Sequence, residues 1–320
     1  MRAAEAAAFG RHFERHRREL QVHCYRLTGS LNDAEDLTQE TFLRAWRARN
    51  SFRGEGTLRA WLYRIATNAC LDAVRTRRRP ALERTPEATG DFEVTWLQPY
   101  PDELLEGLAA PDADPEAALV SKETIELAFI AAIQQLTAGQ RAVLILRDVL
   151  GWRARDTATL LETSVASVNS SLQRARAGLQ EHLPQRRLDW EAESAATPQE
   201  RDLLERYIDA TERADQQAML AILHEDLRFA MPPQPGLFVG REEIVQYWAP
   251  AFDKEGFGRM TGVVTRANMQ PAVACYRQVP GEPRFTPLAL DVIRIEGGSI
   301  REITTFPEEL FPAFGLPEAL

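Results

Sequence analysis

The sequence predicts a multidomain protein in which two all-α modules precede an α+β domain. Over residues 10–80 and 122–185, apolar residues recur at spacings of three and four, as on one face of a helix. After residue 198 a helical stretch gives way to strand-like runs with a hairpin signal. A stretch rich in Pro, Asp and Glu separates the two helical modules and predicts a linker.

Length and charge support this division. The chain has 320 residues and a net charge of -9, and it exceeds the usual ~100 to 200 residues of one domain. Residues 1–80 carry 16 Arg against 9 acids, and residues 126–190 carry 8 basic residues against 6 acids. Residues 81–125 carry 2 basic residues against 11 acidic ones, and residues 191–320 carry 12 basic residues against 21 acidic ones. This alternation of basic and acidic segments predicts two basic units that face nucleic acid and two acidic parts that repel it.

Composition argues against several classes of protein. No apolar run approaches the ~18 residues of a membrane span, and the N-terminus lacks an apolar signal core, so we expect a cytoplasmic protein without membrane contact. No nucleotide-binding or zinc-protease motif is present, and we expect no cofactor and no metal. The cysteines are odd in number and far apart, which argues against a disulfide framework. They are Cys24, Cys70 and Cys275, and the early histidines His12, His16 and His23 are predicted to lie on a solvated helix face.

The first module, residues 1–80, predicts two successive amphipathic helices after an initial helical stretch. Asn32 or Asp33 is expected to cap the first of these. Its predicted inward residues are Leu37, Phe42, Ala45 and Trp46, and its outward residues are Asp33, Asp36, Gln39 and Glu40. In the second of these two helices, the residues predicted to face the core are Leu58, Leu62, Ile65, Ala69 and Ala73, and those predicted to face outward are Arg64, Asn68, Arg75 and Arg78.

Residues 81–121 predict an acidic, flexible linker. It contains the sequence WLQPYPDELL, in which Trp96 and Leu97 are unusual among polar neighbours. They suggest a site at which the linker docks on a neighbouring domain. The alternative is that Trp96 is partly exposed and contacts no partner.

The second module, residues 122–185, predicts a helix-turn-helix. Thr137 and Gln140 form a capping-box pattern before an apolar helix. Two short helical patterns follow, interrupted at residues 162–164, where Thr163 or Ser164 can cap the second helix. The predicted buried face of that helix is Val165, Val168, Leu172, Ala175 and Leu179, and the polar face is Ser167, Asn169, Ser170, Gln173, Arg174 and Arg176. Such a face suits the major groove of DNA, but an ordinary helical hairpin with a solvated face is the alternative.

Residues 198–320 predict an α+β domain. A helical pattern comes first, and the strand-like runs LRFAM, RMTGVVTRA, AVACYRQ, TPLALDVIRI and SIREITTF follow. The last two runs join across Glu296-Gly297-Gly298-Ser299, where glycines supply the positive φ of a hairpin turn.

Three stretches together resemble the extracytoplasmic-function sigma factors of the sigma-70 superfamily. They are DAEDLTQETFLRAWR, FRGEGTLRAWLYRIATNACLDAVRTRRR and LTAGQRAVLILRDVLGW with its helix-turn-helix, in this order. The tail resembles a SnoaL-like domain, a cone-shaped α+β fold, in VGREEIVQYW, TRANMQPAVACY and FPAFGLP.

The resemblance implies a set of partners and contact residues. The partners are core RNA polymerase, through the clamp helices of its largest subunit and its flap region, and promoter DNA. Polymerase-binding positions are Asp36, Gln39, Glu40 and Arg44. Positions for the -10 element are Arg64, Asn68, Asp72, Arg75, Arg77, Arg78 and Arg79. Positions for the -35 element are Ser164, Ser167, Asn169, Ser170, Gln173, Arg174 and Arg176.

The tail is predicted to regulate the sigma modules and not to act as an enzyme, and a small-molecule ligand for it is left open. Two other functions stay open at this point. The first is an enzymatic tail, whose candidate polar groups are His224, Asp226, Tyr276 and Asp291. The second is a helix-turn-helix regulator with a ligand-sensing tail, which would leave residues 32–79 unexplained.

Overall fold

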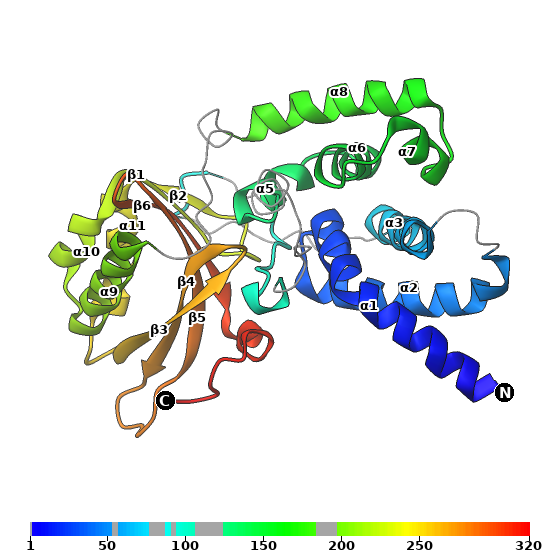
Figure 1. The fold of residues 1–320 in the computed structure, drawn as a ribbon. Helices are drawn as coiled ribbons and strands as arrows, with labels where there is room; N and C mark the ends of the chain where they lie inside the picture. The colour runs from blue at the N-terminus through cyan, green and yellow to red at the C-terminus, as the bar shows by residue number, and fades with distance from the viewer. Residues whose placement is uncertain (1, 53–56, 77–86, 91–93, 106–123, 184–196) are drawn as a thin grey trace. The chain divides into compact units, whose positions relative to one another are not determined.

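The computed structural model describes residues 2–52, 57–76, 87–90, 94–105, 124–183 and 197–320. It divides into two compact units (Figure 1). The first unit comprises residues 1–79 and 104–191 and is helical, and the second comprises residues 80–103 and 192–320 and contains the sheet. The predicted order of helical modules followed by an α+β domain is confirmed.

The first module consists of α1 (Arg2–Thr28), α2 (Leu31–Ala48), the short turn η1 (Arg49–Ser51) and α3 (Leu58–Thr76). Gly29, with φ of +71°, ends α1 in the left-handed conformation that glycine adopts without strain. Ser30 then caps α2 by accepting the Asp33 N–H at 3.2 Å. The predicted cap at Asn32 or Asp33 is therefore wrong, because the break at Gly29 starts the helix earlier and buries Asp33 in its first turn.

His23 lies between α1 and α3. Its Nε2 is 2.8 Å from the Thr67 hydroxyl, its ring lies 4.8 Å from the Tyr63 ring, and it is 1% exposed. The predicted solvated position is wrong for this residue, because α3 covers this side of α1. Burial lowers the pKa of His23 to about 3, so the imidazole is neutral at physiological pH.

The second module consists of α5 (Leu127–Gln134), α6 (Ala138–Leu144), the π-helical turn η3 (Ile145–Val149), α7 (Ala154–Leu160) and α8 (Val165–His182). The predicted capping box is confirmed: Thr137 Oγ1 accepts the Gln140 N–H, and Gln140 Oε1 accepts the Thr137 N–H. Glu162 adopts φ of +51° between α7 and α8. Ser164 caps α8 by accepting the Ser167 N–H at 3.1 Å.

The second unit is a six-stranded sheet with helices. Its strands are β1 (Leu223–Ala230), β2 (Leu237–Val239), β3 (Arg259–Ala267), β4 (Gln270–Gln278), β5 (Thr286–Glu296) and β6 (Ser299–Pro307). Its helical elements are α9 (Pro198–Arg213), α10 (Gln216–Ile222), α11 (Arg241–Tyr247), η5 (Ala249–Phe252) and η6 (Glu308–Phe314). The strand order is β2-β1-β6-β5-β4-β3, antiparallel except for the β1–β6 pair. Gly297 and Gly298, both at positive φ, form the predicted β5–β6 hairpin turn.

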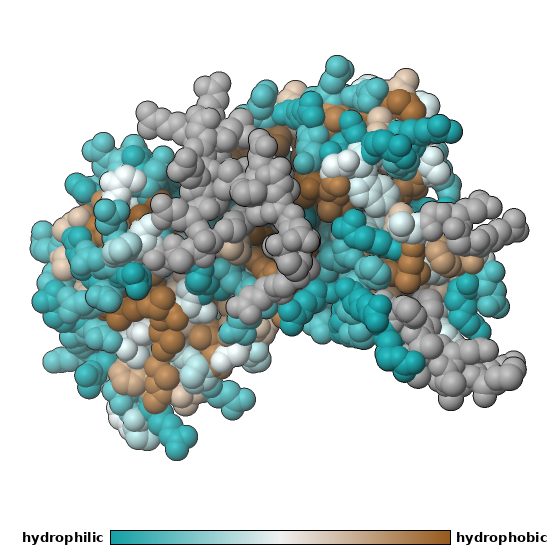
Figure 2. Space-filling model, in the orientation of Figure 1, coloured by the Kyte–Doolittle hydropathy of each residue, from teal (hydrophilic) through white to brown (hydrophobic). Residues whose placement is uncertain are grey.

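The core of the second unit lies between α9, α10, α11 and one face of the sheet (Figure 1). Leu204 and Tyr207 of α9 pack there with Val273, Ile293 and Ile303 of the strands. The outer side of α9 and α10 is mainly hydrophilic (Figure 2). This is the two-layer packing of a helix layer on a sheet, in which each element buries one apolar face.

The described residues 87–90 and 94–103 of the predicted linker belong to the tail domain. Tyr100 and Asn268 exchange two hydrogen bonds: Asn268 Oδ1 accepts the Tyr100 N–H at 2.7 Å, and the Asn268 N–H donates to the Tyr100 carbonyl at 2.8 Å. Asp102, at the start of the turn η2 (Asp102–Leu104), accepts the Met269 N–H at 2.7 Å and Arg266 Nε at 3.1 Å. A flexible linker is predicted over residues 81–121, and within it these contacts attach Tyr100 and Asp102 to the tail domain.

Candidate nucleic-acid interface

Helix α8 presents a polar face that begins at a capped N-terminus. Val168, Leu172 and Ala175 are buried, whereas Ser164, Ser167, Asn169, Gln173 and Arg174 are exposed and Ser170 is half-buried. Val165 is 43% exposed, so its predicted burial is wrong, because the first turn of α8 extends beyond the helices that cover Val168. The hydroxyl and amide groups lie along the first turns of the helix, where they can reach base edges.

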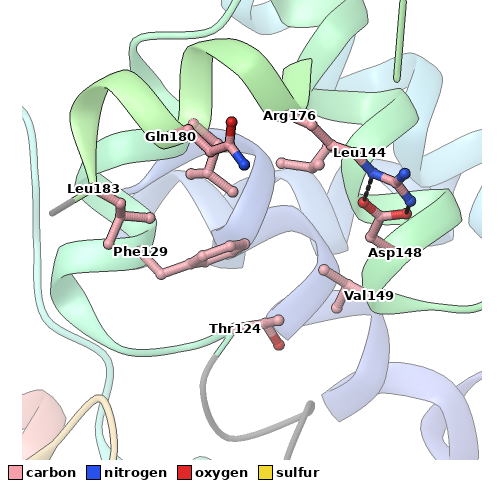
Figure 3. Close-up of a pocket in the computed structure, with 9 residues that line it drawn as sticks. Thr124, Phe129, Leu144, Asp148, Val149, Arg176, Gln180 and Leu183 are labelled. Carbon is pink, nitrogen blue, oxygen red and sulfur yellow. Dashed lines mark hydrogen bonds and ion pairs between the residues drawn. The ribbon is translucent and has the colours of Figure 1, made fainter. Parts of the chain in front are cut away.

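The two arginines of α8 differ in their surroundings. Arg174 is exposed, and its Nη2 is 3.5 Å from the Ser171 hydroxyl. Arg176 forms a bidentate ion pair with Asp148 of η3, with Nε–Oδ2 at 2.9 Å and Nη2–Oδ1 at 2.8 Å (Figure 3). The pair connects α8 to η3, which precedes α7 in the chain, and the sequence pattern did not reveal this contact of Asp148.

An apolar pocket of about 280 Å³ opens beside this ion pair. Figure 3 shows Phe129, Leu144, Val149 and Leu183 around it, with Gln180 and the ion pair at its edge. Leu179 and Thr124 complete the lining. The pocket can accept apolar side chains of a partner, since its walls are mainly hydrocarbon.

A chain of charges connects α2 to α3. Arg44 donates to Glu40 at 2.8 Å and to Asp72 at 3.1 Å, and both carboxylates raise the pKa of Arg44. The structure thus brings together two residues predicted for polymerase binding and one predicted for the -10 element. Because Asp72 is exposed and Glu40 and Arg44 are partly exposed, this network contributes little to stability.

The other candidates of the first module also lie at the surface. Asp36 and Gln39 are exposed on α2, Arg64 and Arg75 are exposed on α3, and Asn68 is half-buried. Arg77, Arg78 and Arg79 lie outside the described residues. In the linker, Leu97 is buried and Trp96 is half-buried.

Three family models match separate parts of the chain. Residues 12–80 match the family model Sigma-70 region 2, residues 126–179 match Sigma-70, region 4, and residues 204–303 match the SnoaL-like domain. The ECF RNA polymerase sigma factor SigG of Mycobacterium tuberculosis (strain ATCC 25618 / H37Rv) is 41% identical over 325 residues, covering 98% of this chain and 85% of SigG. The chain belongs to the ECF RNA polymerase sigma factors. It is accordingly a sigma factor that acts with RNA polymerase in promoter recognition and transcription initiation.

Two further proteins are similar to this sigma factor. The RNA polymerase sigma-H factor of Pseudomonas aeruginosa is 34% identical over 160 residues, which cover 49% of this chain and 77% of the sigma-H factor. The crystal structure of SigJ, an extracytoplasmic function sigma factor of Mycobacterium tuberculosis, matches with a TM-score of 0.59 at 21% identity, covering 96% of this chain and 99% of SigJ. The likeness to SigJ concerns the fold.

Of the four candidate polar groups of an enzymatic tail, His224 and Asp226 lie together on β1, whereas Tyr276 and Asp291 make hydrogen bonds with other residues. His224, on β1, is 2.8 Å from Arg301 and also accepts the Asp226 N–H. Tyr276 donates to the Pro317 carbonyl at 2.9 Å. His224, Glu225 and Asp226 place possible metal-ligand atoms within 4.8 Å of one another, but the neighbouring Arg301 guanidinium disfavours a cation there.

Asp291 is the centre of a buried cluster in the tail. Its carboxyl group accepts hydrogen bonds from Tyr207 at 2.9 Å, Cys275 at 3.2 Å and Thr305 at 2.5 Å. Burial raises the pKa of Asp291, although the three hydrogen bonds favour its ionised form. The cluster satisfies its own polar atoms, which fits a structural role in the core of the cone.

Among the residues that the structure describes, no helix is both long enough and apolar enough to cross a membrane.

Proposed function

We propose that α8 reads the -35 promoter element in the major groove. The observation that carries this assignment is the contrast between the two sides of α8: Val168 and Ala175 are fully buried, while Ser167, Asn169 and Gln173 are exposed behind a capped N-terminus. Hydroxyl and amide groups of such a helix can contact base edges, and Arg174 can contact phosphate.

Helix α3 and the residues before it bind and open the -10 element in this proposal. Arg64 and Arg75 are exposed on α3 and can pair with phosphates, and Asn68 lies between them. Capture of an unstacked base offsets the few kcal/mol that opening a base step costs.

Polymerase binds two separate surfaces in this proposal. Asp36, Gln39, Glu40 and Arg44 on α2 contact the clamp helices of the largest subunit. The apolar pocket beside Phe129 and Leu183 receives side chains of the flap region, because its hydrocarbon walls gain free energy when they are covered.

The tail domain regulates the sigma modules through their connection. The chain leaves the first module, passes through the second unit at residues 80–103 and returns to the helical unit. The contacts of Tyr100 and Asp102 with the β3–β4 turn hold part of this connection and limit the separation of the modules. A signal or small ligand that releases the connection would raise activity, and we expect no catalysis by the tail.

Run-off transcription with purified core polymerase tests the proposal. The full chain should bind core polymerase and start transcription at a specific promoter, and a chain ending at Arg187 should be more active. Because that truncation also uncovers Leu97 and Tyr100, the full-length variant Asn268→Ala should accompany it. DNA binding without polymerase binding would instead support a helix-turn-helix regulator, and equal or lower activity of both variants would reject an inhibitory tail.

A further inference from the structure

The ion pair between Asp148 and Arg176 joins two walls of the apolar pocket (Figure 3). Asp148 lies on η3, which also contributes Val149 to the lining. Arg176 lies on α8, which contributes Leu179 and, at its C-cap, Leu183. Two parallel N–H···O bonds fix the relative orientation of a guanidinium and a carboxylate as well as their distance. The pair therefore fixes how α8 is oriented on η3.

The other walls of the pocket hold α8 less specifically. They include Phe129 of α5 and Leu144 of α6. Contacts between hydrocarbon groups have no preferred direction. The pocket of about 280 Å³ also leaves part of this surface without a packed neighbour. Hydrocarbon contacts at the pocket thus allow α8 to tilt, and the ion pair adds a directional contact that opposes the tilt.

A tilt at the pocket end of α8 moves the residues proposed to read DNA. Asn169 lies seven positions before Arg176 on the same helix, which is about 10 Å at ~1.5 Å per residue. A rotation of about 10° at Arg176 displaces Asn169 by about 2 Å over that length. Because N–H···O hydrogen bonds span only about 2.7–3.2 Å, a displacement of this size breaks a contact with a base edge. Base reading by α8 thus depends on the orientation that the ion pair holds.

Water weakens the ion pair while the pocket is open. The side chain of Arg176 is 59% exposed and that of Asp148 is 32% exposed, and exposed ion pairs contribute little because solvent screens their charges. A group that fills the pocket displaces water beside the pair. The attraction grows about fourfold if the effective dielectric constant falls from about 80 to about 20. The two hydrogen bonds satisfy the charged groups as water leaves, so the pair is stronger when the pocket is occupied.

We propose that the Asp148–Arg176 pair couples polymerase binding at the pocket to reading of the -35 element by α8. Arg176 is then a positioning residue that acts through the orientation of α8 and not through contact with phosphate. Flap side chains in the pocket tighten the pair, and the tightened pair holds Asn169 in reading geometry. Because coupling between two sites is reciprocal, -35 DNA also strengthens binding at the pocket. This coupling rests on the proposed flap and -35 contacts and adds how one affects the other.

The coupling is tested by the affinity of the full chain for -35 DNA, alone and in the holoenzyme with core RNA polymerase. The probe is a labelled duplex that carries the -35 element of a promoter that the holoenzyme transcribes. Asp148→Asn keeps the side-chain shape and removes the charge, and Arg176→Lys keeps the charge and removes the bidentate geometry. The matched control Asp209→Asn breaks the exposed Asp209–Arg213 pair of α9.

Both variants should lose affinity for the -35 duplex mainly in the holoenzyme. There the loss should be roughly tenfold, whereas in the free chain it should stay below about twofold, because the uncovered pair is weak. The salt dependence of binding should not change, since neither variant loses a phosphate contact. The exchanged pair Asp148→Arg/Arg176→Asp should recover most of the affinity that Arg176→Asp loses. The control should match the unsubstituted chain.

A direct phosphate contact by Arg176 predicts the opposite sign. Removal of the Asp148 charge would then free Arg176 for DNA, so an unchanged or higher holoenzyme affinity in Asp148→Asn would overturn the proposal. Equal losses in the free chain and in the holoenzyme would also overturn it, because they would indicate a general disturbance of α8. Thermal unfolding of each variant, followed by circular dichroism, identifies a variant that does not fold, and Arg176→Lys keeps the comparison available if Asp148→Asn is unstable.

The unsubstituted holoenzyme separates this coupling from the proposed function. If it prefers the -35 duplex to a scrambled duplex and the variants match it, only the coupling is rejected. If it shows no preference, the proposed reading of the -35 element by α8 is rejected, and the coupling with it.

Discussion

Arg176 of α8 and Asp148 of η3 form a bidentate ion pair, with both N–O distances below 3.0 Å. The sequence pattern assigned Arg176 to the polar face that reads DNA. The ion pair means that Arg176 would have to leave Asp148 to bind a phosphate, whereas Arg174 is exposed. The two arginines are therefore expected to respond differently to substitution.

Arg174→Ala should weaken promoter binding. A plot of the log of the binding constant against the log of the salt concentration has a negative slope, and the substitution should make that slope shallower by about one unit, because one phosphate contact is lost. Arg176→Ala should lower that slope less. Fluorescence anisotropy with a labelled promoter at several salt concentrations provides the measurement. Arg206→Ala on the exposed side of α9 is the control, and an unchanged slope for Arg174→Ala would remove Arg174 from the interface.

Asn169→Ala should change sequence preference more than salt dependence. An amide that reads a base edge discriminates by about 1–3 kcal/mol, while it carries no charge to neutralise phosphate. Competition between the promoter and single-base variants of its -35 element measures this. Gln180→Ala, at the other end of α8, should leave preference unchanged, and equal loss of affinity for every variant would argue against base reading by Asn169.

The triple variant Asp36→Ala/Gln39→Ala/Glu40→Ala should remain folded but lose core polymerase binding. Exposed substitutions seldom cost more than about 0.5 kcal/mol, and the Glu40–Arg44 pair is partly exposed. Co-purification with core polymerase is the measurement. The matched triple Asp202→Ala/Gln199→Ala/Glu205→Ala on α9 should bind normally, and wild-type recovery of the α2 variant would show that this surface is assigned wrongly.

The helical unit should lose stability as the pH falls, partly through His23. The pKa of His23 is lowered from 6.5 to about 3 in the folded chain, so the unfolded chain binds the proton first. Stability is therefore fully present above about pH 6.5 and declines toward pH 3, by up to about 4 kcal/mol. Hydrogen exchange of α1 and α3 amides across this range should show the decline in the wild type and a weaker one in His23→Gln. Identical pH profiles for the two proteins would contradict the assignment.

Asn268→Ala should release the linker from the tail domain. The substitution removes the acceptor of the buried Tyr100 N–H, a loss of about 1–3 kcal/mol. Faster hydrogen exchange at residues 97–103, with unchanged exchange in β5, is the expected result. Asn50→Ala at an exposed position is the control, and unaltered protection in Asn268→Ala would mean that other contacts hold the linker.

Local patterns in the sequence were sufficient for the features that depend on neighbouring residues. The Thr137–Gln140 capping box, the Ser164 cap and the glycine turn at residues 297–298 each rest on contacts within a few positions, and all three are present. The buried face of α8 was predicted at Val168, Leu172 and Ala175 because helical periodicity identifies a face, but it failed at Val165, where the covering helices end.

The sequence by itself determined that the chain has two helical modules and an α+β domain, since periodicity and turn residues act over short stretches. Only the tertiary structure decided what covers each face. It buried His23 and Asp33, paired Arg176 with Asp148, and attached Tyr100 to Asn268 across 168 positions. It also gave the end of α1 its cap from Arg141, 114 positions away. Such contacts join residues whose separation carries no periodic signal, and their free energy depends on burial that exists only in the folded chain.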